Sequence, residues 1–91
     1  MRVRWTAPAA QDLYRITQHI RRDNPTAALE VAKMLYDACE SFVNMPHRGR
    51  RGRRPDTREL VFTDLPYIAV YRVRKDVVEI VHIWHGAEDW R

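Results

Sequence analysis

The 91-residue chain has few or none of the residues on which several common protein classes depend. Its single cysteine, Cys39, allows no disulfide within the chain. Cys39 also falls in the apolar stripe of a predicted helix, so no zinc-binding set is expected. Its single serine, Ser41, falls inside the same predicted helix, which excludes the triad of a serine hydrolase. No apolar run approaches the ~20 residues of a membrane span. We therefore expect a cytoplasmic protein that binds no metal or cofactor.

Glycine is also scarce, with three residues in the chain. The sequence contains no Gly-rich phosphate loop, no dinucleotide fingerprint and no nucleophile elbow. A chain of this length forms one domain, residues 1–91, and buries only roughly 60–65% of its unfolded surface. So thin a core leaves no room for an enclosed small-molecule site. We expect function on an exposed face, with macromolecules as partners.

Arginine is abundant, and it is unevenly placed along a chain of net charge +4. Six arginines lie within eleven residues: Arg48, Arg50, Arg51, Arg53, Arg54 and Arg58. Guanidinium groups match phosphate and carboxylate, and the interspersed Gly49 and Gly52 could let backbone N–H groups approach an anion. This cluster predicts an anionic partner, either a nucleic acid or an acidic protein segment, and the five residues from Arg48 to Arg54 are the predicted contact surface.

The pattern of apolar residues and turn residues predicts an α+β fold. Thr6 and Pro8 mark the start of one helix and Asn24-Pro25 the start of another, and their short connection makes them an antiparallel hairpin. The expected order is β-α-α-β-β-β, with the hairpin packed on one face of a small, mainly antiparallel sheet. The predicted ranges are a strand over 2–5, helices over about 7–22 and 25–44, a loop over 47–57, and strands over 58–63, 67–74 and 77–84.

The end of the last predicted strand carries residues that are able to do chemistry. His82 and His85 are three positions apart, so in a regular strand they face opposite sides and share no metal ion. His85 is either a general acid near neutral pH or a strand-end histidine bonded to backbone. Trp90 either stacks on a base or packs the tail onto the body. Tyr71, in the middle of a strand, is predicted to be structural.

Six segments of the chain, in order, resemble the RelE/ParE superfamily of toxins. They are Val3–Leu13, with its strand and "A-x-x-D-L"; Asp23–Ala28; Pro46–Arg50; Thr57–Leu60; Tyr67–Val73; and His85–Trp90. Each segment is weak evidence alone, but six in the right order identify the chain as a member. The resemblance implies the fold predicted above and a toxin neutralised by a small cognate antitoxin.

Two activities occur in that superfamily, and the resemblance leaves both open. ParE-like members poison DNA gyrase, whereas RelE-like members enter the ribosome and cleave mRNA. The matching positions for a ribonuclease site are Arg58 and His85, while Glu88 replaces an arginine of many relatives. The long second helix, the Asn-Pro connection and the Gly-Arg loop favour the ParE branch. Gyrase is therefore the favoured target, with ribosome and mRNA as the alternative.

A non-catalytic nucleic-acid-binding module is the alternative from outside the superfamily. Such a module typically places exposed aromatic residues among its basic residues, so that bases can stack. Residues 47–58 contain no aromatic side chain of the Phe, Tyr or Trp type. The sequence therefore favours a toxin over a plain nucleic-acid-binding module.

Overall fold

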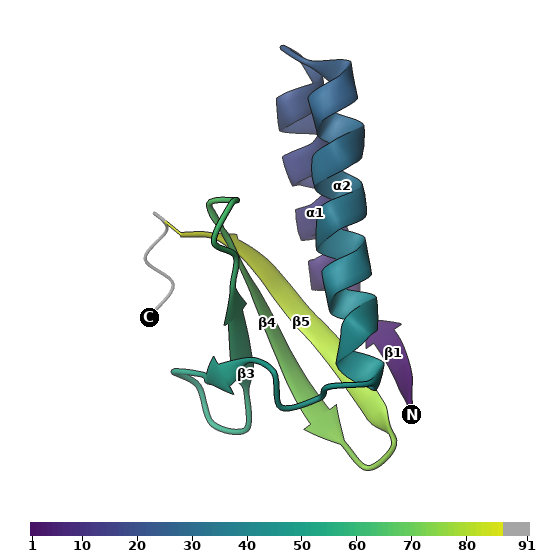
Figure 1. The fold of residues 1–91 in the computed structure, drawn as a ribbon, viewed down its shortest axis with the longest axis vertical. Helices are drawn as coiled ribbons and strands as arrows, with labels where there is room; N and C mark the ends of the chain where they lie inside the picture. Colours follow the sequence, from purple (N-terminus) through teal and green to yellow (C-terminus); the bar gives the residue numbers. More distant parts are fainter. Residues whose placement is uncertain (87–91) are drawn as a thin grey trace.

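A computed structural model describes residues 1–86 of the chain and has the predicted α+β architecture. Two helices lie side by side on one face of a five-stranded sheet (Figure 1). In chain order the elements are β1 (Arg2–Trp5), α1 (Ala7–Arg21), α2 (Pro25–Glu40), a 3₁₀ turn (Ser41–Val43), β2 (Arg50–Arg51), β3 (Arg58–Val61), β4 (Tyr67–Arg74) and β5 (Val77–His85). None of the helices in this part of the chain combines the length and apolar character that a bilayer crossing requires.

Both helices begin where the capping residues predict. The Thr6 hydroxyl accepts a hydrogen bond from the Ala9 amide and donates one to the Ile80 carbonyl, so it ties the start of α1 to β5. The Asn24 side chain accepts from the Ala27 amide at 3.0 Å, and Pro25 occupies the first turn of α2. These caps fix the first residue of each helix.

The second helix is shorter than predicted, because regular α-helix ends at Glu40 and a 3₁₀ turn follows. The Ser41 hydroxyl donates to the Ala38 carbonyl, a local bond of the kind that competes with helical geometry. The tighter turn still directs Phe42 into the core, where its ring stacks on Tyr71 with centroids 3.9 Å apart.

The sheet has the order β1-β5-β4-β3-β2, and it is mainly antiparallel as predicted. The exception is β1, which pairs parallel to β5 and so places the first strand beside the last. Strand β2 was not predicted and lies inside the expected loop. It forms because the Gly52 amide donates to the Thr57 carbonyl at 2.7 Å, which closes a hairpin and pairs Arg50–Arg51 with the start of β3.

The core lies between the helices and the sheet. Its largest fully buried members are Tyr71, Phe42, Leu35, Ile80 and Ile83. A bulge in β5 allows both Ile80 and Ile83 to be buried. Tyr71 pairs with Ile80 while Val70 pairs with His82, which leaves Val81 as an extra residue. Ile80 and Ile83 thus both join the core, and His82 lies against Trp84 with ring centroids 4.5 Å apart.

Candidate functional site

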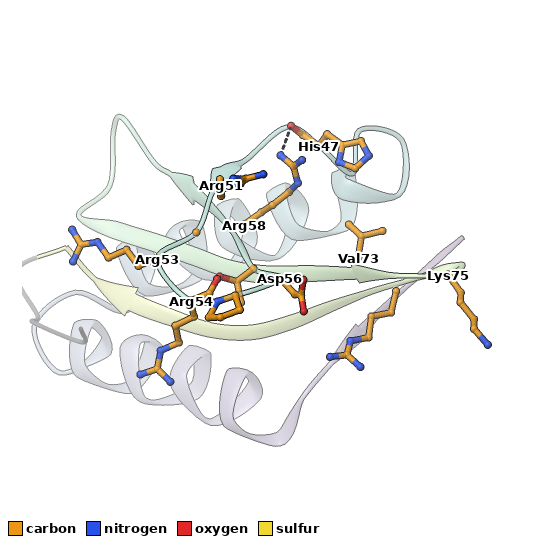
Figure 2. Close-up of a pocket in the computed structure, with 12 residues that line it drawn as sticks. His47, Arg51, Arg53, Arg54, Asp56, Arg58, Val73 and Lys75 are labelled. Carbon is orange, nitrogen blue, oxygen red and sulfur yellow. Dashed lines mark hydrogen bonds between the residues drawn. The ribbon is translucent and has the colours of Figure 1, made fainter.

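A strongly charged surface in the described residues is an open hollow of about 920 Å³. Its side chains come from the loop after α2, from β3, and from the end of β4 with the turn that follows (Figure 2). The lining contains six positively charged side chains and one carboxylate, Asp56. The cations are Arg51, Arg53, Arg54, Arg58, Arg74 and Lys75. We call this surface the basic hollow.

The five arginines predicted as an anion-binding surface do not act as one group. Arg51, Arg53 and Arg54 line the basic hollow. Arg48 donates instead to the Ser41 hydroxyl at 3.1 Å and lines a different groove. Arg50 forms an ion pair at 3.0 Å with Glu59. The roles of these residues in binding remain predictions, but their positions divide them into three environments.

Glu59 is the residue that organises the arginine loop, and sequence reasoning missed it. Its side chain is only 1% exposed, and it accepts hydrogen bonds from the Arg50 guanidinium and from the Arg53 backbone amide at 3.1 Å. A buried carboxylate needs such partners, because its desolvation is otherwise too costly. The sequence signal was an acid directly after Arg58, at the end of the arginine-rich stretch.

The two glycines of the loop are needed for close packing. The Gly49 amide donates to the Tyr71 hydroxyl at 2.8 Å, and the Gly52 amide donates to the Thr57 carbonyl. A Cβ atom on Gly49 would lie 2.8 Å from the Tyr71 ring, and one on Gly52 would lie 2.2 Å from the Thr57 hydroxyl oxygen. The amides of both glycines therefore already have hydrogen-bond partners within the protein.

Arg74 and Lys75 join the basic hollow although they lie far from the arginine loop in the sequence. The antiparallel pairing of β3 with β4 explains this, because Arg58 at the start of β3 pairs with Tyr71, three residues before the end of β4. The sequence predicted a mainly antiparallel sheet but not which residues of these two strands are neighbours.

A second glutamate extends the positive surface across three strands. Glu79 on β5 contacts the guanidinium groups of Arg4 on β1 and of Arg72 and Arg74 on β4. The hydrogen bond from Arg72, at 2.6 Å, holds the pKa of the Glu79 carboxyl below its usual value. Three guanidinium groups around one carboxylate leave this part of the sheet net positive.

The two residues predicted for a ribonuclease site are not brought together. Arg58 pairs with Tyr71, and His85 pairs with Tyr67 four positions away on β4, which is roughly 13 Å along the strand. The Arg58 guanidinium donates to the Gly49 carbonyl at 2.8 Å and, more weakly, to the His47 carbonyl (Figure 2). The His85 ring lies edge-on to the Tyr67 ring.

A histidine–carboxylate pair lies elsewhere, beside a hollow of about 600 Å³ along α1. Asp12, only 5% exposed, accepts hydrogen bonds from His82 Nδ1 at 2.9 Å and from the Ile83 amide at 3.0 Å. It also pairs with Arg15. Asp12 of α1 thus binds β5 at residues beyond Ile80, with which the last residue of β1 pairs.

Several remaining expectations concern single residues. Cys39 is fully buried, and burial, with a smaller contribution from Glu40, raises the pKa of its thiol to about 12, so it stays protonated. Within residues 1–86 no cluster of three or more metal-ligating side chains occurs. Trp5 packs against the core, with its ring stacked on Tyr36. Glu88 and Trp90 lie outside the described residues.

Comparison with known proteins gives a consistent result in sequence and in structure. Residues 3–90 match the family model described as the ParE toxin of the type II toxin–antitoxin system parDE. The chain is similar in structure to a chain from the chromosomal ParDE toxin–antitoxin system of P. aeruginosa, with a TM-score of 0.84 and 27% identity, covering 93% of this chain and 95% of that one.

Two curated relatives are both named as toxins. The chain is 40% identical to a putative toxin, Y4kP, of Sinorhizobium fredii, over 98% of this chain and 92% of the relative. It is 39% identical to the toxin RelE2 of Caulobacter vibrioides, over 91% of this chain and 92% of the relative.

Proposed function

Because the chain belongs to the ParE toxin family of type II toxin–antitoxin systems, we propose that it arrests growth by poisoning DNA gyrase. The match to the ParE toxin family over residues 3–90 is the observation that carries the proposal. The separation of Arg58 from His85 supports it, because a ribonuclease needs both groups at one phosphodiester. A gyrase poison has no chemical step of its own and needs only a binding surface.

The family implies a cognate antitoxin, and a second surface suits its docking. A groove of about 240 Å³ runs between α2 and the β3–β4 connection, and it is lined chiefly by Met34, Leu60, Val61, Phe62 and Leu65. Such apolar positions receive the anchors of an amphipathic segment. Arg48 lies at the same groove and would pair with an acidic residue of that segment.

Cleavage of ribosome-bound mRNA is the second candidate, and two observations favour it. One is the name RelE2 of a relative that is 39% identical. The other is the orientation of His82, whose Nδ1 is held by Asp12 while its ring borders a hollow that also contains Arg15 and Arg22. A ribonuclease of this chain would therefore use His82 as its base in preference to His85.

The experiment that separates the two candidates measures gyrase and mRNA in parallel. We expect purified toxin to trap gyrase in cleavage complexes, and toxin-expressing cells to show double-strand breaks and an SOS response while mRNA stays intact. His82→Ala and His85→Ala should retain this activity. Loss of a general base lowers a rate by ~10²–10⁴. Codon-spaced cuts in ribosome-bound mRNA that disappear in His82→Ala, with normal supercoiling by gyrase, would establish the second candidate instead.

A further inference from the structure

We propose that the basic hollow binds the phosphodiester backbone of duplex DNA, so that the toxin contacts the DNA held by gyrase as well as the enzyme. This inference deepens the proposed function and rests on it for the source of the DNA. Its evidence, however, is the surface itself. Positive side chains from three separate segments converge on one hollow, with Asp56 as the single carboxylate in its lining.

The chemistry of the lining favours a nucleic acid over an acidic protein segment. Protein–DNA interfaces are polar and strongly positive, whereas an amphipathic peptide needs apolar pockets for its anchors. Val73 and Pro55 are the only apolar side chains in the lining as described. Apolar anchors find their place in the groove of Leu60 and Phe62, on the other side of the arginine loop.

The absence of Phe, Tyr and Trp from the lining as described favours a duplex over a single strand. Single-strand binding sites typically stack bases on exposed aromatic side chains, and the hollow as described is lined by no Phe, Tyr or Trp. Contacts from guanidinium and ammonium groups to phosphate need no unstacked base. The expected binding is therefore electrostatic and independent of base sequence.

The cations are held in place by the fold before any ligand arrives. The hairpin that carries Arg51 is closed by the bond from Gly52 to Thr57 and anchored by Glu59. On the opposite side, Lys75 lies in a tight turn with φ of 52°, and Arg74 adjoins the cluster around Glu79. A surface fixed in this way loses little conformational entropy on binding.

The surface also extends beyond the hollow. Arg74 and Arg72 lie on β4, and Arg4 lies on β1, two strands away in the sheet. All three contact the same carboxylate, that of Glu79 on the strand between them. Neighbouring strands are ~4.8 Å apart, so this row adds about 10 Å of positive surface beside the hollow. A backbone with several phosphates can therefore meet several cations at once.

The test compares two double variants that lose the same charge. Arg51→Ala and Lys75→Asn remove two cations of the hollow, with asparagine chosen because it tolerates the left-handed backbone at that position. Arg21→Ala and Lys33→Ala remove two exposed cations of the helices. Binding of the whole chain and of each variant to a fluorescent 30-base-pair duplex is measured by anisotropy between 50 and 200 mM salt, and thermal melts verify folding.

We expect the hollow variant to bind more weakly and with a salt slope lower by about 1.8, since each of the two phosphate contacts adds about 0.9. Between 50 and 200 mM salt it should therefore lose about 12-fold less affinity than the original chain. The helix variant should match the original chain. Equal losses of DNA affinity in both variants would show that only net charge matters and would overturn the inference. A hollow variant that keeps DNA binding but loses binding to polyglutamate, which stands for an acidic protein segment, would overturn it as well.

The outcomes for DNA and for gyrase are separable. If the toxin traps gyrase but does not bind DNA at 50 mM salt, the inference fails and the proposed function stands. If it binds DNA through the hollow but leaves gyrase unaffected, the inference stands and the proposed function fails.

Discussion

At the scale of single residues, Tyr71 connects the core to the arginine loop. Its ring is fully buried against Phe42, and its hydroxyl donates to the Pro46 carbonyl at 2.9 Å while accepting from the Gly49 amide. Burial raises the pKa of the phenol, so it remains a donor throughout the neutral range. One side chain thus fixes the backbone from which the loop departs.

The change Tyr71→Phe should destabilise the protein by about 1–3 kcal/mol, because the Gly49 amide then lacks its partner in a buried place. Urea denaturation measures the difference. Tyr14→Phe is the matched control, since Tyr14 is 66% exposed and should show no change. Equal stability of the two variants would contradict the anchoring role of Tyr71.

At the scale of elements, the β2–β3 hairpin gives the arginine-rich segment a defined backbone geometry by pairing Arg50–Arg51 with the start of β3. Charged residues on a short edge strand also discourage pairing with other chains. The hairpin depends on Gly52, since a Cβ there would lie 2.9 Å from the Thr57 carbonyl oxygen as well as closer to its side chain. The geometry of the arginines therefore depends on a residue that carries no charge.

Gly52→Ala tests this dependence because it changes the hairpin and leaves every charge in place. We expect lower toxicity at equal expression, together with a loss of stability of about 1–2 kcal/mol from the forced shift of Thr57. Growth inhibition and a thermal melt are the measurements. Gly86→Ala is the control, because a Cβ there meets its nearest atom at 3.4 Å. Full toxicity of Gly52→Ala would show that charge alone suffices.

At the scale of the whole molecule, the fold separates two kinds of surface. The apolar groove lies beside α2 and the β3–β4 connection, and the basic hollow lies where β3 begins and β4 ends. A toxin with separate surfaces can be bound by an antitoxin through one and by its target through the other. Whether the antitoxin also covers the hollow then decides how neutralisation works.

A cognate antitoxin should raise the melting temperature of the toxin, because a ligand of the folded state stabilises it by mass action. At 100 times the dissociation constant the gain is about 2.7 kcal/mol, which for a domain of this size is a shift of more than about 10 °C. Val61→Glu should reduce the shift, since Val61 lines the groove, whereas the more exposed Leu29→Glu should not. No shift with a saturating antitoxin would refute the partnership.

The sequence by itself determined what depends on neighbours along the chain. The caps at Thr6 and Asn24 are local hydrogen bonds, so both helix starts were predictable. The Val-, Ile- and Tyr-rich run of residues 67–74 and the turns on either side of it likewise predicted the observed bounds of β4. The family resemblance rested on short segments in order, and the match over residues 3–90 confirmed it.

The tertiary structure alone decided how these pieces combine. Glu59 and Asp12 are ordinary surface acids by sequence, and only their burial and hydrogen bonds in the fold make one hold the arginine loop and the other hold His82. Strand pairing brought Arg74 beside Arg58, and it kept His85 away from both. Contacts between distant residues depend on register and burial, which no local pattern specifies.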